Sequence, residues 1–134
     1  MKKISHIGIA VKDLAVSEDL FRKLLGTSDV HHEVIEDQGV SIASFKVGDA
    51  IIELTEATRD DSPIAKFIAK RGEGIHHLAI ETDDVVGELA RLKSEGIQLI
   101  DETPKPGAHD MQIAFLHPKS TSGVLIEFCQ KSPS

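Results

Sequence analysis

The stretch HHLAIETDDVVGELARLKSEG, residues 76–96, is a second version of SHIGIAVKDLAVSEDLFRKLLG, residues 5–26. The alignment places His77 on His6, and in both copies an alternating apolar run leads through an acidic turn into a helical pattern. Further along, GDAIIEL and SGVLIEF match each other and set one carboxylate inside an apolar run. Self-similarity on this scale indicates two similar half-chains.

Both halves show the same order of elements, which is one strand, one helix and three strands. In the first half the patterns predict a helix at 15–25 and strands at 4–11, 28–35, 40–46 and 50–56. In the second half they predict a helix at 84–95 and strands at 75–82, 97–100, 110–116 and 123–129. Between the halves, Ser62, Pro63 and Gly72 are typical helix start and stop residues and predict a helix near 63–71. We therefore expect an α+β fold, a single domain of residues 1–134 with βαβββ modules at 1–57 and 74–130.

The composition narrows the class of function. The 134 residues have a formal net charge of −7, which argues against non-specific binding to nucleic acid or to an anionic membrane. No apolar run reaches about 18 residues and no signal peptide is recognisable, so we expect a cytoplasmic protein that acts on a small molecule. The single Cys129 cannot form an internal disulfide, and its apolar surroundings favour packing over reactivity.

Strand alternation separates the two adjacent histidines. His77 shares a strand face with Ala79, whereas His76 shares the opposite and more apolar face with Ile80. His6 occupies the position in the first copy that matches His77, while the residue that matches His76 is a serine. The histidines at 6 and 77 are therefore the pair that the repeat preserves.

The lone carboxylates Glu53 and Glu127 raise a charge problem. Burying an ionised carboxylate without a partner costs several kcal/mol, so each needs a cation, hydrogen-bond donors or water. One divalent metal shared with His6 and His77 would supply that cation, because a 2+ charge offsets two carboxylates. Structural histidines and water-facing edge glutamates explain the same residues without a metal, and a duplication copies structural residues as well.

These residues lie in segments that resemble the vicinal oxygen chelate superfamily, which includes glyoxalase I, extradiol dioxygenases and methylmalonyl-CoA epimerase. The resemblance is strongest to the epimerase family and covers nearly the whole chain, through SHIGIAVKDL, DSPIAKFIAKRGEGIHHLAIETDD, LIDETPKPGAHDMQIAFLHPKS and GVLIEFCQ. It implies a glyoxalase-like fold, in which the two modules form an open, eight-stranded half-barrel around a metal cleft. It also implies metal ligands at His6, Glu53, His77 and Glu127.

The resemblance implies a reaction as well. Enzymes of this family interconvert (2R)- and (2S)-methylmalonyl-CoA by removing and returning the C2 proton through a metal-stabilised enolate. One divalent metal ion (Co, Mn, Zn, Ni or Mg), an acyl-CoA substrate and a homodimer are implied with it. Glu127 is our candidate for one of the two proton carriers, because a carboxylate can leave a metal to take a proton.

Two positions depart from the family pattern. Glu53 stands where some epimerases have glutamine, which gives this chain a glyoxalase-like ligand set. Ile42, two residues beyond Val40, stands where some members carry a carboxylate that is proposed as a base. Glyoxalase I (lactoylglutathione lyase) is therefore an alternative within the fold, and a metal-free small-molecule-binding protein of the resistance type is an alternative from another class.

Overall fold

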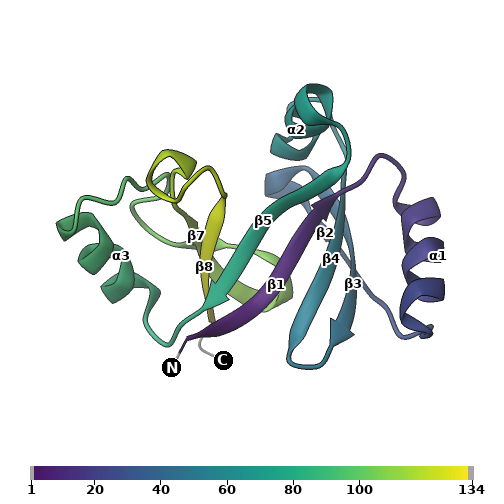
Figure 1. The fold of residues 1–134 in the computed structure, drawn as a ribbon, viewed down its shortest axis with the longest axis horizontal. Helices are drawn as coiled ribbons and strands as arrows, with labels where there is room; N and C mark the ends of the chain where they lie inside the picture. Colours follow the sequence, from purple (N-terminus) through teal and green to yellow (C-terminus); the bar gives the residue numbers. More distant parts are fainter. Residues whose placement is uncertain (1, 133–134) are drawn as a thin grey trace. The chain divides into compact units, whose positions relative to one another are not determined.

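Figure 1 shows the fold in a computed structural model of the chain, which describes residues 2–132. Within this range there are eight strands and three α-helices. They belong to two compact units, one formed by Ile7–His76 and the other by the residues up to His6 together with those from His77 onward. Strands β1 (Lys3–Ala10) and β5 (Gly74–Glu81) contribute residues to both units.

In the unit Ile7–His76, three strands pair antiparallel in sequence order, namely β2 (His31–Ile35), β3 (Val40–Val47) and β4 (Ala50–Ala57). Val47 pairs with Ala50, which leaves a two-residue turn between β3 and β4. Gly48 begins this turn with a φ of 61°, a conformation that glycine adopts without steric cost.

Two helices complete this unit. Helix α1 (Leu14–Leu25) packs on β3 and β4 over a core in which Phe45 and Leu54 are fully buried. Helix α2 (Pro63–Arg71) begins where the Ser62 hydroxyl accepts a hydrogen bond from the Ile64 N–H at 3.2 Å. A capping serine followed by proline explains why the chain turns helical at this point. The linking helix predicted at 63–71 is confirmed.

In the second unit, the strands lie in the order β1-β5-β8-β7-β6, with β6 (Lys105–Pro106), β7 (Met111–Phe115) and β8 (Ile126–Lys131). Strand β8 pairs parallel with β5 and antiparallel with β7. Helix α3 (Val85–Ser94) packs on β7 and β8, and its Val85 and Leu89 form a core with Phe128. Side chains of β7 and β8 that point away from α3 lie on the opposite face of these strands.

The strand predicted at 97–100 is wrong. This segment makes one bridge, between Leu99 and Leu116, and its Ile97 N–H donates to a carbonyl at the end of helix α3. The Gln98 N–H donates to the Ser120 hydroxyl at 2.9 Å, for example, instead of to a neighbouring strand. The short strand β6 at Lys105–Pro106 takes the edge position beside β7. Apolar alternation over four residues is too short to distinguish a strand from a bridged loop.

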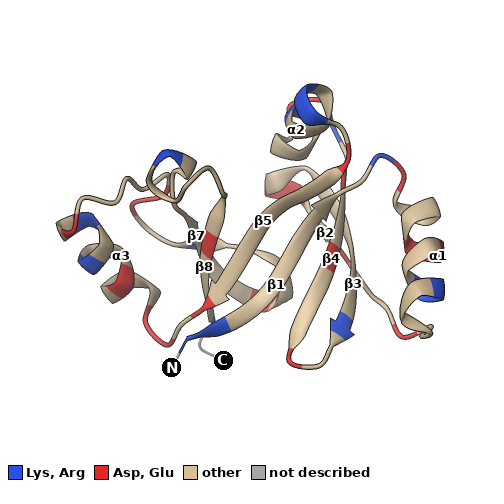
Figure 2. Cartoon of the chain, in the orientation of Figure 1, with Lys and Arg blue, Asp and Glu red and all other residues tan. Residues whose placement is uncertain are grey.

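The order of elements is β-α-β-β-β, a helix, and β-α-β-β-β again, so the glyoxalase-like α+β class predicted from the sequence is confirmed. Three short 3-10 helices, Glu36–Gln38, Ala108–Asp110 and Pro118–Ser120, lie in the loops. Figure 2 shows that most charged residues lie on helices, loops and strand ends. The division into modules at 1–57 and 74–130 stays a prediction. Within residues 2–132, no helix has the length and apolar character that a membrane crossing needs.

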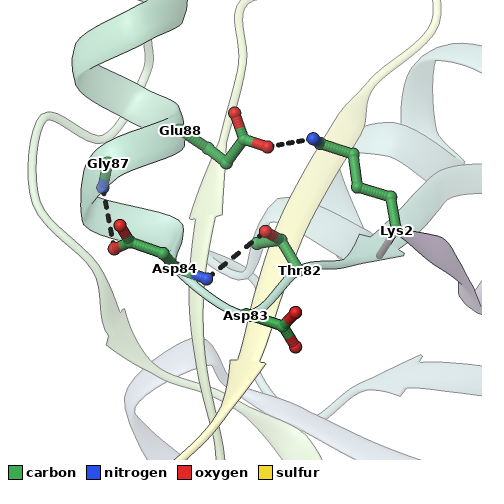
Figure 3. A pocket seen from close by; sticks show the side chains of 6 residues that line it. All are labelled: Lys2, Thr82, Asp83, Asp84, Gly87 and Glu88. Atoms are coloured by element: carbon green, nitrogen blue, oxygen red, sulfur yellow. Dashed lines mark hydrogen bonds and ion pairs between the residues drawn. The ribbon is translucent and has the colours of Figure 1, made fainter.

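An open pocket lies where β5 leads into α3, and Figure 3 shows the residues around it. Asp84 caps α3 by accepting a hydrogen bond from the Gly87 N–H at 3.0 Å. Glu88 pairs with Lys2 and, at 2.8 Å, with Arg91. These contacts anchor the first residues of the chain to the start of a helix, so the pocket's polar groups serve the fold.

The Lys2–Glu88 pair predicts a pH-dependent contribution to stability. Hydrogen bonds from Lys2 and then from Arg91 hold the pKa of Glu88 below its ordinary value. A lowered folded-state pKa stabilises the protein above the unfolded-state pKa, and this contribution is lost as pH falls through the folded-state pKa. We expect Glu88→Gln to lower the free energy of unfolding at pH 7 by at most about 1 kcal/mol, because surface pairs are screened. Urea denaturation measures this loss.

The difference between Glu88→Gln and the wild-type protein should shrink as the solution is acidified below about pH 4, where the unfolded-state carboxyl is protonated. Glu102→Gln is the matched control, since Glu102 pairs with Lys93 through two side chains that are both more than 60% exposed. A Glu88→Gln effect that is independent of pH would contradict the ion-pair explanation.

Candidate metal centre

Two buried histidines face each other across neighbouring strands. His6 on β1 is 5% exposed and His77 on β5 is 7% exposed, and the two strands are adjacent in the sheet. The Nε2 atoms of the two rings lie 3.1 Å apart, and the rings meet edge to face with centroids 5.1 Å apart. The structure therefore brings together the histidine pair that the repeat preserves.

Glu127 completes a cluster with these histidines. It lies on β8, where the parallel register places it beside Ala79 of β5, and it is 3% exposed. Its Oε2 lies 3.5 Å from Nε2 of His6, and its Oε1 lies 3.5 Å from Nε2 of His77. All three residues belong to one compact unit.

The spacing of these atoms fits a divalent cation. Ligand atoms about 2.1 Å from a metal and at right angles to each other lie about 3 Å apart, close to the 3.1 and 3.5 Å seen here. The Oε2 atom of Glu127 is buried and accepts no hydrogen bond from the described residues. A buried carboxylate oxygen in this state is costly, and a cation between it and two imidazole nitrogens would satisfy it. The donor set of two nitrogens and one carboxylate suits Zn, Co, Ni or Mn.

Other residues support the two histidines. The Ser5 hydroxyl lies 3.1 Å from Nδ1 of His6, the ring nitrogen that faces away from the cluster, and Ser5 is 6% exposed. The ring of Phe115 packs edge to face against His77 with centroids 5.8 Å apart. Neither residue is recognisable as part of the site from the sequence patterns. Phe115 pairs with Glu127 in the β7–β8 register, which apolar patterning alone does not reveal.

A lysine is held next to this cluster. The Nζ of Lys105 lies 5.4 Å from the centre of the Phe115 ring and 3.3 Å from a carboxylate oxygen of Asp101. The other oxygen of Asp101 accepts a hydrogen bond from the Phe115 N–H at 2.9 Å. Asp101 thus holds the lysine over the ring that packs on His77.

His76 has different surroundings from His77. It is half-buried in the unit Ile7–His76, where its ring packs edge to face on Phe67 of α2 with centroids 5.0 Å apart. The sequence predicts that the two adjacent histidines lie on opposite faces of the strand. The contact with α2 gives His76 a packing role.

The fourth predicted ligand lies in the other unit. Glu53 is 4% exposed on β4, where it pairs with Ser44 of β3. It is not a member of the cluster of His6, His77 and Glu127. Its predicted role as a ligand therefore rests on the repeat and on its burial, and it stays a prediction.

Two further sequence expectations concern apolar side chains. Ile42 on β3 is 3% exposed and pairs with Thr55, whose buried hydroxyl makes no hydrogen bond to the described residues. Cys129 is fully buried on β8 and packs with Ala79 and Ile113, which confirms its predicted role as a packed small residue.

Residues 5–115 match the Glyoxalase/Bleomycin resistance protein/Dioxygenase superfamily, and the chain belongs to this superfamily. Within it, the chain is homologous to methylmalonyl-CoA epimerases. It is 39% identical to the mitochondrial methylmalonyl-CoA epimerase of Dictyostelium discoideum over 96% of this chain and 78% of that one. It is 35% identical to the ethylmalonyl-CoA/methylmalonyl-CoA epimerase of Cereibacter sphaeroides over 96% of this chain and 97% of that one.

A solved structure gives the same result. A methylmalonyl-CoA epimerase in complex with methylmalonyl-CoA and NH4+ superposes with a TM-score of 0.94 at 38% identity, covering 98% of this chain and 96% of that one. At this identity and coverage the likeness concerns the whole chain and not the fold alone. The predicted resemblance to the epimerase family is confirmed.

Proposed function

We propose that this protein interconverts (2R)- and (2S)-methylmalonyl-CoA by moving the C2 proton of the substrate. The observation that carries the proposal is the buried cluster of His6, His77 and Glu127 in a chain whose full length is homologous to methylmalonyl-CoA epimerases. The homology supports an acyl-CoA substrate, and the cluster supports a divalent cation next to it. The homodimer and the cytoplasmic location expected from the sequence stay predictions.

His6, His77 and Glu127 would hold the ion, with Glu53 as the fourth ligand that the repeat and the family resemblance predict. An ion bound there supplies positive charge to substrate oxygens on which negative charge develops when the C2 proton leaves. The imidazoles would bind as neutral ligands, so the two carboxylates would balance the 2+ charge.

Glu127 is our candidate for one proton carrier. Its carboxylate takes the C2 proton and becomes a neutral acid, while the electron pair of the C–H bond moves into the thioester carbonyl. Return of a proton to the opposite face of C2 completes the inversion and restores the charge balance. The carrier on that face is not residue 42, because the alkyl side chain of Ile42 cannot hold a proton.

The first prediction of this proposal concerns the substrate. We expect the purified protein, after addition of Co²⁺ or Mn²⁺, to epimerise methylmalonyl-CoA at C2. The C2 hydrogen should exchange with deuterium from the solvent, which mass spectrometry measures. Glu53 in a glyoxalase-like ligand set makes methylglyoxal with glutathione the competing substrate to assay in parallel. Faster turnover of that pair would favour glyoxalase I. A protein that contains no metal and gains no activity with added ions would favour the metal-free binding protein.

The second prediction separates the adjacent histidines. His77→Ala removes a ring nitrogen from the cluster and should weaken Co²⁺ binding more than 100-fold. Loss of a residue that only supports a ligand costs roughly 10- to 100-fold, and loss of the ligand itself should cost more. His76→Ala removes only a ring that packs on Phe67 and should retain the metal. Isothermal titration with Co²⁺ measures both, with the circular dichroism of each variant as the folding control. Equal metal loss in the two variants would contradict the proposed ligand set.

The third prediction tests the proton carrier. Glu127→Gln keeps the size and a coordinating oxygen but cannot take a proton, so the rate of C2 deuterium exchange should fall by roughly 10²- to 10⁴-fold, the usual contribution of a positioned base. The metal content of the variant is measured beside the rate. Unchanged exchange at full metal occupancy would remove Glu127 from the proton transfer.

A further inference from the structure

Strands β6, β7 and β8 share a face that points away from helix α3. Phe128 packs in the core under α3, so its neighbour Glu127 points to the opposite face, as does Phe115, which pairs with Glu127. Lys105 of β6 pairs with Ile113, two residues before Phe115, and therefore lies on the same face. The face that carries Glu127 of the cluster thus also carries a lysine.

This lysine is held in position and still has donors to offer. Its Nζ lies 5.4 Å from the centre of the Phe115 ring and 3.3 Å from a carboxylate oxygen of Asp101. The same ring packs on His77 of the cluster. An ammonium group has three N–H donors, and within residues 2–132 Asp101 is the carboxylate that pairs with this one. The Lys105 side chain is 44% exposed, so a ligand in solution can reach it.

We infer that Lys105 binds an anionic oxygen of the acyl-CoA substrate, an inference that rests on the proposed function. A malonate-type acyl-CoA carries a carboxylate on its acyl group and phosphates on CoA. The formal net charge of the chain is −7 and Glu127 lies on the same face, so the substrate's negative charges need a fixed cation there. A lysine ammonium binds carboxylate and phosphate oxygens alike as a point charge.

The contacts of Lys105 favour binding for a second reason. A free lysine side chain loses rotamer freedom when it binds a ligand, and this loss weakens the complex. Asp101 is itself fixed, because its other carboxylate oxygen accepts a hydrogen bond from the Phe115 N–H at 2.9 Å. The ion pair and the ring together hold the ammonium group before any ligand arrives, so less freedom is lost on binding.

The first test measures binding by isothermal titration and needs no turnover. In the Co²⁺-loaded protein, Lys105→Gln should bind methylmalonyl-CoA roughly 10-fold more weakly than the wild-type protein, the usual effect of losing one hydrogen bond to a charged group. Propionyl-CoA lacks the acyl carboxylate, and methylmalonyl-pantetheine lacks the CoA phosphates. A loss of affinity for methylmalonyl-pantetheine but not propionyl-CoA assigns Lys105 to the carboxylate, and the reverse assigns it to a phosphate. Affinities of Lys105→Gln within twofold of the wild type for all three ligands would overturn the inference.

Two variants control for charge and for structure. Lys93→Gln removes the same charge from a lysine that also pairs with a carboxylate, that of Glu102, but Lys93 lies on α3, which packs on the other face. It should keep wild-type affinity. Lys105→Arg keeps the charge and should bind methylmalonyl-CoA within about threefold of the wild type. Circular dichroism checks the folding of each variant. An equal loss of affinity in Lys93→Gln and Lys105→Gln would overturn the inference.

The kinetics separate this inference from the proposed function. Lys105→Gln should raise KM for methylmalonyl-CoA roughly 10-fold and keep kcat within about threefold, because Lys105 is not assigned a proton transfer. A protein that binds methylmalonyl-CoA through Lys105 without exchanging its C2 hydrogen would support the role of Lys105 and contradict the epimerase activity. Normal exchange in Lys105→Gln with unchanged KM would overturn the role of Lys105 and leave the epimerase activity intact.

Discussion

The buried carboxylate of Glu127 is the constraint on which the site depends. Its oxygens lie 3.5 Å from two imidazole nitrogens that are themselves 3.1 Å apart, and one oxygen accepts no hydrogen bond from the described residues. Coulomb and hydrogen-bond energies are large in such a water-poor setting, so an arrangement of this kind persists only if a cation or a proton satisfies it. The three side chains need the β1-β5-β8 strand order to meet, which ties the topology directly to the chemistry.

The duplicated sequence supplies equivalent positions, and the structure shows how differently they are used. His6 has a serine hydroxyl at Nδ1, whereas His77 has the ring of Phe115 against it. The residues before the two histidines have different roles. Ser5 contacts its neighbour His6, whereas His76 packs on Phe67 of helix α2. A repeat thus preserves the nitrogens that face the cluster, while their surroundings diverge. Different neighbours can make two histidine ligands differ in how basic the ring nitrogen is and in how firmly the ring is held.

Much of the fold and part of the site follow from sequence patterns. Strand alternation assigns His77 and His76 to opposite faces, because the side-chain period of two leaves no freedom once the strand is placed. The capping signals at Ser62 define helix α2 for a similarly local reason. The loop at 97–100 is misjudged because its partners, Leu116 and Ser120, are distant in sequence. Phe115 is missed because its proximity to His77 depends on the register of β7 against β8.

The two departures from the family pattern have opposite electrostatic consequences. A glutamate at position 53 adds one negative charge, while an isoleucine at position 42 removes one that a carboxylate would carry. If both carboxylates of the proposed ligand set bind, they neutralise a 2+ ion, and the ion then withdraws less charge from the substrate than it does with a glutamine ligand. Deprotonation of C2 would consequently depend more on the strength of the base.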